Sequence, residues 1–558
     1  MILKKVRELL SSDILKLVGK FVFISSPAAI FALSWSDLRR FPNLFFYDPS
    51  YAYLYNGVVI TQGGVPGHTD HPGTSLQWIS GITSQIFHSL RDTGISLVQD
   101  VVANSDDFIR VNGLLLSAIF SLSVGVFGFR ILKQLGAIEC LIATVVFWAG
   151  FRLWYPQLYI LAPESLVISS SILVVALVIP NLFKTHIQTS DRTLILIGIL
   201  LSIGLTSKII ALPILVMFPF LLRPRQLLLI AVALVSTTML ILIPVYSRAG
   251  LMLGWFFGVS TKPSRWGQQT SEQLSIRLNF QDALAKLFSV APQLIACFVG
   301  ALILVIGIFA LRKKNSARIT EPENWRPFIG ILLSILTAFA MGFKQSVERD
   351  FVVLAVLVPV FVLLVFQKFK PVIMNPQSPS SSRLLTAIVV IALFGSSIFT
   401  LRAVRETSLN LGAIEKSYEE VMTEVANLEN SNWVISAYGS PSSGNASLFG
   451  SYWANNAFRA ELVRTFPRYM ELNIWEKSIR GWNREQSLIK LDCQEINERI
   501  RLSRMFILIP EYLDDYWPNR SGSLRLSGQS LRIESESLIG NGLTMIAVTN
   551  CQSDQQAD

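Results

Sequence analysis

The stretch "LLSIGLTSKIIALPILV", residues 200–216, decides the fold class of this chain. It is apolar nearly throughout and is interrupted by one ammonium group, that of Lys208. About 20 apolar residues cross the roughly 30 Å of hydrocarbon in a bilayer. The same character holds over the 558 residues, of which 51% are hydrophobic and 15% are charged, with a mean hydropathy of +0.48. Since soluble proteins are about a quarter charged, the sequence predicts a polytopic α-helical membrane protein.

Apolar runs of similar length recur along the chain up to residue 401. We expect about 11 membrane-spanning helices, of which the two on either side of Lys208 are the shortest. The expected spans are 14–36, 108–132, 137–155, 160–182, 193–207, 209–222, 226–246, 287–311, 327–343, 351–367 and 384–401.

The net charge of +10 does not indicate a nucleic-acid-binding protein, because the basic residues do not gather on one soluble domain. They lie in short loops between apolar runs, as the positive-inside rule predicts for cytoplasmic loops. No clear cleavage site follows the first apolar run, so we expect no cleaved signal. We therefore expect a plasma (inner) membrane protein with a cytoplasmic N-terminus. Four segments then face outside, namely 37–107, 247–286, 344–350 and the tail from 402.

Within the first outer loop, "HPGTSLQWISGITSQIFHSL" (71–90) has apolar residues at helical spacing and a polar opposite face. This pattern is typical of a helix that lies at the membrane interface rather than one that crosses it. Trp78 suits the same depth.

The tail changes character and predicts a small extracytoplasmic α/β domain over 402–558. A polar helix is expected at 411–430, and short buried strands at 433–438, 505–510 and 543–549. Cys493 and Cys551 both lie in this domain, and two interpretations stay open: a disulfide, which an outer compartment permits, or two buried free thiols. The other two cysteines, Cys140 and Cys297, lie in apolar segments and are expected to pack as small hydrophobic residues.

The first candidate for chemistry is Asp48, in "FFYDPSYAYLYNG" (45–57), just beyond the first span. A carboxylate in this tyrosine-rich loop, which includes Tyr51, can act as a general base toward an acceptor hydroxyl. The plain alternative is a turn, because Asp-Pro commonly opens one.

His68, Asp70 and His71 form a second candidate. Imidazole and carboxylate groups both suit divalent metals, and Asp48 can complete such a set. The alternative is an ordinary turn-rich loop, since glycines and prolines surround the segment.

Three further candidates lie at the predicted outer ends of spans. Glu164 in "APESL" borders hydrocarbon, which makes it a functional hypothesis, or it merely caps a helix. Lys208 can bind a lipid phosphate as a point charge, or it snorkels to the interface. Arg349 in "ERD" can clamp a phosphate, whereas we interpret Glu348 and Asp350 as members of a surface cluster.

These motifs, taken in order, resemble those of one family. "YDPSYAYLYNG", "DHPGTSLQW", "APESL", "GLTSKIIALPIL" and "ERDFVVLAVLVP" are similar to motifs of the polyprenyl-phosphate-dependent glycosyltransferases with the GT-C fold. The likeness is greatest to the branch of protein mannosyltransferases and lipid A aminoarabinose transferases. It covers residues 1–400. Gly73 departs from a usual proline, Asp350–Phe351 stands where a tyrosine is usual, and the tail from 402 resembles nothing that we can place.

The resemblance implies a GT-C-like transmembrane domain over 1–401 and an inverting transfer of a sugar from a polyprenyl phosphate to a glycan, lipid or protein acceptor at the outer face. It implies Asp48 as the acid-base or metal-associated carboxylate and Glu164 as a supporting acid. It implies contacts of Lys208 and Arg349 to the donor phosphate. Tyr51, Asp70 and His71 would line the same pocket.

Two rival interpretations remain. A transporter or flippase of lipid-linked intermediates predicts broken helices paired across an inverted repeat, and we find no repeat. A membrane anchor carrying a binding module does not require the long first outer loop.

Overall fold

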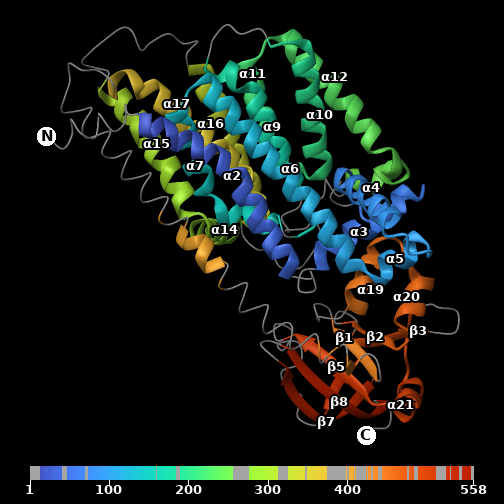
Figure 1. Cartoon of the computed structure of the whole chain (residues 1–558). Helices are drawn as coiled ribbons and strands as arrows, with labels where there is room; N and C mark the ends of the chain where they lie inside the picture. The colour runs from blue at the N-terminus through green and yellow to red at the C-terminus, as the bar shows by residue number, and fades with distance from the viewer. Residues whose placement is uncertain are drawn as a thin grey trace. The chain divides into compact units, whose positions relative to one another are not determined.

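The computed structural model describes most of the helices and the C-terminal sheet (Figure 1). The described residues are 13–40, 47–69, 73–158, 160–183, 189–254, 276–311, 325–345, 348–373, 401–407, 432–437, 443–473, 477–482, 488–510, 523–527, 529–539, 543–553 and isolated positions between 398 and 428.

The chain forms two compact units, and each unit combines segments that are distant in sequence. The first unit comprises Met1–Ser36, Thr69–Leu76 and Gly113–Thr407. The second comprises Asp37–His68, Gln77–Asn112 and Ser408–Asp558. The predicted domain boundary at 401/402 stays a prediction.

The first unit is helical. Its α-helices are α2 (Asp13–Arg40), α6 (Ser105–Gln134), α7 (Ala137–Trp148), α8 (Phe151–Trp154), α9 (Pro163–Phe183), α10 (Asp191–Ser207), α11 (Phe218–Leu221), α12 (Pro224–Ile241), α14 (Ile276–Val290), α15 (Pro292–Leu311), α16 (Arg326–Gln345) and α17 (Leu354–Ile373), although the first residues of α6 and the last of α2 belong to the second unit. Its 3-10 helices are η2 (Tyr155–Gln157), η3 (Ile209–Met217), η4 (Ile243–Arg248) and η8 (Glu348–Phe351).

Among the described residues, 6 helices are long and apolar enough to cross a membrane, or up to 8 if each bent pair counts as one span. The bent pairs are α7 with α8 and η2, and α14 with α15. The expected span at 193–207 is the 17-residue α10, and the expected span at 209–222 is η3 with α11. Most of the span expected at 384–401 lies outside the described residues. The polytopic helical class is confirmed, whereas the count of about 11 is not.

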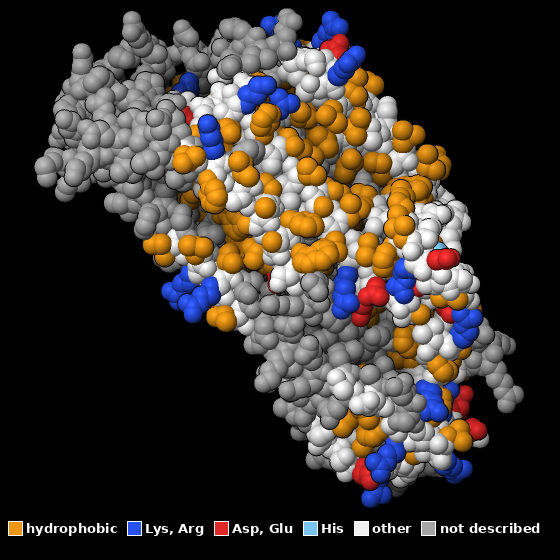
Figure 2. Space-filling view, viewed as in Figure 1, with side chains coloured by type: hydrophobic (Ala, Val, Ile, Leu, Met, Phe, Trp, Pro, Cys, Tyr) orange, Lys and Arg blue, Asp and Glu red, His pale blue; other side chains and the backbone are white. Residues whose placement is uncertain are grey.

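Side chains of these helices form a largely apolar surface in Figure 2, where orange groups gather over the helical unit. Leu122 and Phe129 of α6 and Leu228 and Val232 of α12 are all exposed. Exposed apolar side chains on this scale are unfavourable in water and favourable against lipid. The surface therefore agrees with the membrane class that the composition predicts.

The second unit contains helices from the loop at 37–107 and a mixed sheet from the tail. Its helices are α3 (Tyr47–Thr61), α4 (Thr74–Arg91, of which the first residues belong to the first unit), α5 (Leu97–Ala103), α19 (Ser443–Trp453), α20 (Arg459–Thr465) and α21 (Cys493–Leu502). Helix α4 is the amphipathic helix expected at about 71–90.

The sheet has 8 strands in the order β4-β3-β2-β1-β5-β8-β7-β6. They are β1 (Trp433–Ala437), β2 (Tyr469–Asn473), β3 (Ser478–Trp482), β4 (Leu488–Lys490), β5 (Met505–Pro510), β6 (Ser523–Leu526), β7 (Gln529–Ile539) and β8 (Leu543–Ser553). Strand β1 pairs in parallel with β2 and β5, and the other pairs are antiparallel.

The three strands expected from sequence are β1, β5 and β8, which are neighbours at the centre of the sheet. Continuous apolar runs predict strands that are buried on both faces. Ile435, Ile507 and Ile546 pair with one another and are fully buried on one face of the sheet, and Val434 and Leu508 are buried on the other. The outer strands carry more polar residues and were not expected. Most of the expected helix at 411–430 lies outside the described residues.

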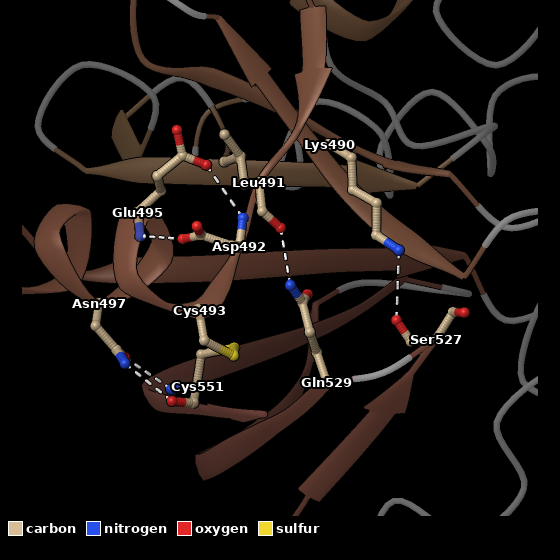
Figure 3. Close-up of a disulfide and its surroundings, with 9 residues drawn as sticks. All are labelled: Lys490, Leu491, Asp492, Cys493, Glu495, Asn497, Ser527, Gln529 and Cys551. Carbon is tan, nitrogen blue, oxygen red and sulfur yellow. Dashed lines mark hydrogen bonds between the residues drawn. A yellow bond between two sulfur atoms is a disulfide. The ribbon is translucent and has the colours of Figure 1, made fainter. Parts of the chain in front are cut away.

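A disulfide joins Cys493, the first residue of α21, to Cys551 of β8 (Figure 3). Asn497 supports the same junction, because its amide donates to the carbonyl of Cys551 at 2.9 Å and accepts from the backbone N–H of Cys551 at 2.8 Å. Asp492 caps α21 by accepting from the N–H of Glu495 at 2.8 Å. Of the two interpretations that the sequence left open, the disulfide is confirmed.

Candidate functional site

Lys208 lies at a break between two helices. Helix α10 ends at Ser207, Lys208 is extended (φ −161°, ψ 142°), and η3 continues the chain as a 3-10 helix of 9 residues that contains Pro213. Runs of 3-10 helix this long are uncommon and often mark functional positions. At the break, the side chain of Lys208 points into protein and is only 4% exposed.

Two carboxylates hold the Lys208 ammonium. Its Nζ donates to Oε1 of Glu164 and to Oδ1 of Asp350, each at 2.7 Å. Glu164 stands in the first turn of α9, and Asp350 lies in η8. The snorkelling interpretation of Lys208 is therefore wrong, since the ammonium is buried and paired.

Arg349 adds a second cation. Its Nε lies 3.5 Å from Oε1 of Glu164, and its side chain keeps 31% of its surface exposed. We call Glu164, Lys208, Arg349 and Asp350 the charge cluster. Its two acids and two bases sum to zero formal charge, so each charge has an opposite charge nearby whose attraction offsets part of the desolvation cost.

The charge cluster retains acceptor capacity. Oε2 of Glu164 and Oδ2 of Asp350 are buried and have no hydrogen-bond partner among the described residues. An ionised carboxylate accepts several hydrogen bonds. Both acids can therefore accept further bonds from hydroxyl or amine groups, while the partly exposed guanidinium of Arg349 can meet an anion.

The segment that follows Asp70 and His71 is fixed to the same break. The N–H of Gly73 donates to the carbonyl of Ser207 at 3.1 Å, and the hydroxyls of Ser75 and Thr206 lie 2.5 Å apart. Gly73 has φ +52°, a left-handed conformation that favours glycine. The positive φ explains why glycine rather than proline stands at position 73, because proline requires a negative φ. Asp70 and His71 themselves lie outside the described residues.

The structure thus brings together three of the predicted site residues, Glu164, Lys208 and Arg349. It also corrects one interpretation, because Asp350 is 2% exposed and pairs with Lys208 rather than lying in a surface cluster. A sequence signal was available, since Asp350 directly precedes the apolar run that begins at Phe351, and an acid at the border of such a run needs a partner. The side chain of Glu348 lies outside the described residues.

The remaining predicted residues with described positions belong to the second unit. Asp48 is in the first turn of α3, but its side chain lies outside the described residues. Tyr51, one turn further on, is fully buried, and its hydroxyl donates to Oδ1 of Asp106 at 2.6 Å. A role of Tyr51 toward substrate stays a prediction.

His68 is buried, and its ring packs edge-to-face against Tyr53 and Trp453, with centroids 5.2 and 4.9 Å away. Burial lowers the pKa of His68 to about 4, so the imidazole is neutral at pH 7. Neutral imidazole is the form that binds metals. Among the described residues no group of three or more His, Cys, Asp and Glu can hold a metal ion, and three of the four predicted ligand side chains lie outside them.

Comparison with known proteins places the fold. No protein-family model and no curated protein sequence matches the chain. The apo crystal structure of ArnT from Cupriavidus metallidurans is similar, with a TM-score of 0.50 and 11% identity over 94% of this chain and 97% of that one. The structure of the same ArnT bound to undecaprenyl phosphate has a TM-score of 0.47 and 12% identity over the same shares. The chain therefore has the fold of ArnT, and the expected GT-C fold is confirmed.

Proposed function

We propose that this chain is a membrane glycosyltransferase that moves a sugar from a polyprenyl-phosphate donor to an acceptor at the outer face of the membrane, with inversion. The observation that carries the proposal is the charge cluster, located at a break between helices in a chain with the fold of ArnT. One of the two ArnT crystal structures is bound to undecaprenyl phosphate.

The leaving group of this reaction is the lipid phosphate. Arg349 is the cation best suited to contact it, because its side chain is 31% exposed whereas that of Lys208 is 5% exposed. Lys208 already donates two of its three N–H groups to Glu164 and Asp350, which leaves one for the phosphate. Fixed cations at a developing negative charge lower the barrier.

Asp48 is the proposed general base. The acceptor oxygen attacks the anomeric carbon, the bond from that carbon to the phosphate oxygen breaks, and the acceptor proton passes to the carboxylate of Asp48. The phosphate keeps the electron pair of the broken bond. Glu164 acts as the supporting acid by orienting Lys208. Tyr51, Asp70 and His71 are the proposed substrate-binding residues.

A divalent cation held by Asp48, His68, Asp70 and His71 is a separate part of the proposal. Its test is metal removal. Treatment with a chelator followed by gel filtration should abolish transfer, and added Mg²⁺, Mn²⁺ or Zn²⁺ should restore it. Full activity after complete metal removal contradicts the metal site.

Sidedness is also proposed. The basic loops support a cytoplasmic N-terminus in an inner membrane, and the Cys493–Cys551 disulfide supports an extracytoplasmic tail, because such bonds persist in oxidising compartments. About 11 spans, a membrane domain over 1–401 and a soluble domain over 402–558 belong to the same proposal.

A transporter of lipid-linked intermediates is the second candidate. The discontinuity between α10 and η3 favours it, because transporters build their sites from broken helices. It requires movement of an intact lipid-linked sugar rather than loss of the sugar.

The deciding experiment uses purified protein in detergent with radiolabelled polyprenyl-phosphate sugars. We expect the wild type to remove sugar from the lipid and Asp48→Asn to be inactive yet normally folded. Asp191→Asn, a change at a side chain that is 64% exposed, is the matched control. Loss of sugar at equal rates in wild type and Asp48→Asn removes Asp48 from the mechanism. No loss with any donor, combined with lipid movement in vesicles, supports the transporter instead.

A further inference from the structure

The C-terminal tail shares a core with the first outer loop inside the second unit. Helix α19, from the tail, packs along α3, from the loop that begins just after the first span. The sequence predicted the tail as a separate soluble domain over 402–558. The contacts at this junction show that residues 443–456 pack against the loop.

Because Gly450 has no side chain, α19 approaches the backbone of α3 closely. A Cβ placed at Gly450 would overlap the ring of Tyr55 and would lie 2.9 Å from the carbonyl oxygen of Tyr51. Both tyrosines are fully buried. Any larger residue at Gly450 must therefore push α19 away from the helix that carries Asp48.

Asn56 joins three segments through one buried side chain. Its amide donates to the carbonyl of Ala52 at 2.7 Å and to that of Trp453 at 3.1 Å. Its Oδ1 accepts from the N–H groups of Gly67 at 2.7 Å and His68 at 3.1 Å. A buried amide with all its capacity used specifies one arrangement of its partners.

The end of α19 completes the junction. Trp453 packs edge-to-face on the ring of His68. Beyond it, Asn455 and Asn456 both adopt a left-handed conformation, with φ of 58° and 57°, which asparagine tolerates well. This turn lets the side chain of Asn455 donate to the carbonyl of Val65 at 3.2 Å.

We propose that residues 443–456 are a positioning clamp, in which Gly450, Trp453 and Asn455 hold α3 and residues 65–68 of the first outer loop in place. The tail then helps to position the loop that carries Asp48. The catalytic consequence, a loss of kcat with little change in KM for the donor, rests on the proposed function, whereas the physical clamp does not.

Amide hydrogen exchange on the full-length protein in detergent tests the clamp without any activity assay. In Trp453→Ala we expect exchange in peptides covering 51–61 and 65–68 to accelerate about 10-fold or more, because local opening becomes less costly. Tyr452→Ala is the matched control, since the adjacent Tyr452 is 64% exposed, and it should leave these peptides unchanged. Strands β5 and β8 serve as the internal reference for folding.

A second pair of variants, with smaller structural changes, tests the clamp if Trp453→Ala fails to fold. Asn455→Gly and Asn456→Gly both preserve the left-handed backbone, but only Asn455 donates to Val65 among the described contacts. We expect faster exchange at 65–68 in Asn455→Gly alone. Unchanged exchange in both Trp453→Ala and Asn455→Gly overturns the clamp. Faster exchange in a protein with no transferase activity supports the clamp and counts only against the proposed function.

Discussion

The Nζ of Lys208 lies 2.7 Å from Oδ1 of Asp350, a residue 142 positions away in sequence. Glu164 contacts the same ammonium at the same distance. Asp350 is therefore not a surface acid but a buried partner of the lysine at the break between α10 and η3. The first prediction concerns its contribution to stability.

Asp350→Ala should destabilise the folded protein by about 3–5 kcal/mol, because removal of one partner leaves uncompensated charge in the buried cluster. Thermal unfolding in detergent measures the effect. Asp191→Ala, at an exposed position, is the control. Equal melting temperatures for the two variants contradict a structural role for the Lys208–Asp350 pair.

Arg349→Ala should weaken apparent affinity for a polyprenyl-phosphate donor about 10- to 100-fold, the effect of losing a charge-assisted hydrogen bond. Lys208→Ala should also weaken donor binding, with an added loss of stability that Arg349→Ala largely avoids, since Arg349 is partly exposed. Donor titration of transfer measures both. Arg225→Ala, at a side chain that is 86% exposed, should change nothing; unaltered donor affinity in Arg349→Ala removes that residue from the phosphate site.

Stability should fall in mild acid because of His68. Its pKa is about 4 in the folded state and near 6.5 when unfolded, so the unfolded chain binds the proton more tightly. His68 therefore contributes about 3 kcal/mol to the free energy of unfolding. This contribution is complete above pH 6.5 and is lost as the pH falls toward 4. Melting curves between pH 7.5 and 4.5 measure it. His68→Phe, which keeps a buried ring, should flatten the slope; an identical slope in that variant shows that other groups cause it.

Reduction of the disulfide should destabilise the tail. Closing a separation of 58 residues contributes about 4 kcal/mol in the chain-entropy model. Thiol labelling of the denatured protein should detect two cysteines, Cys140 and Cys297, without reductant and all 4 with it. Melting of the Cys493→Ser/Cys551→Ser variant, compared with Cys297→Ala, measures the stability. Four reactive thiols before reduction would refute the bond.

Much of the fold was predictable because the relevant signals are local. Apolar runs long enough to cross a bilayer identify α2, α6, α9 and α17, and runs such as "MFILIP" identify β5 at the centre of the sheet. The shorter, more polar strands were not predictable, since their burial depends on which neighbours cover them. The break after Ser207 was visible only as a lysine in an apolar run.

The same distinction between local and long-range signals applies to the candidate site. Sequence alone determined the membrane class, the motifs around Glu164, Lys208 and Arg349, and the two cysteines able to pair, because composition, order and residue chemistry are properties of the linear chain. Only the tertiary structure decided that Asp350 completes the charge cluster, that Cys493 bonds Cys551, and that α19 packs on α3. These contacts join residues far apart in sequence, and their energies depend on distance, burial and the number of satisfied partners, which arise only when the chain has folded.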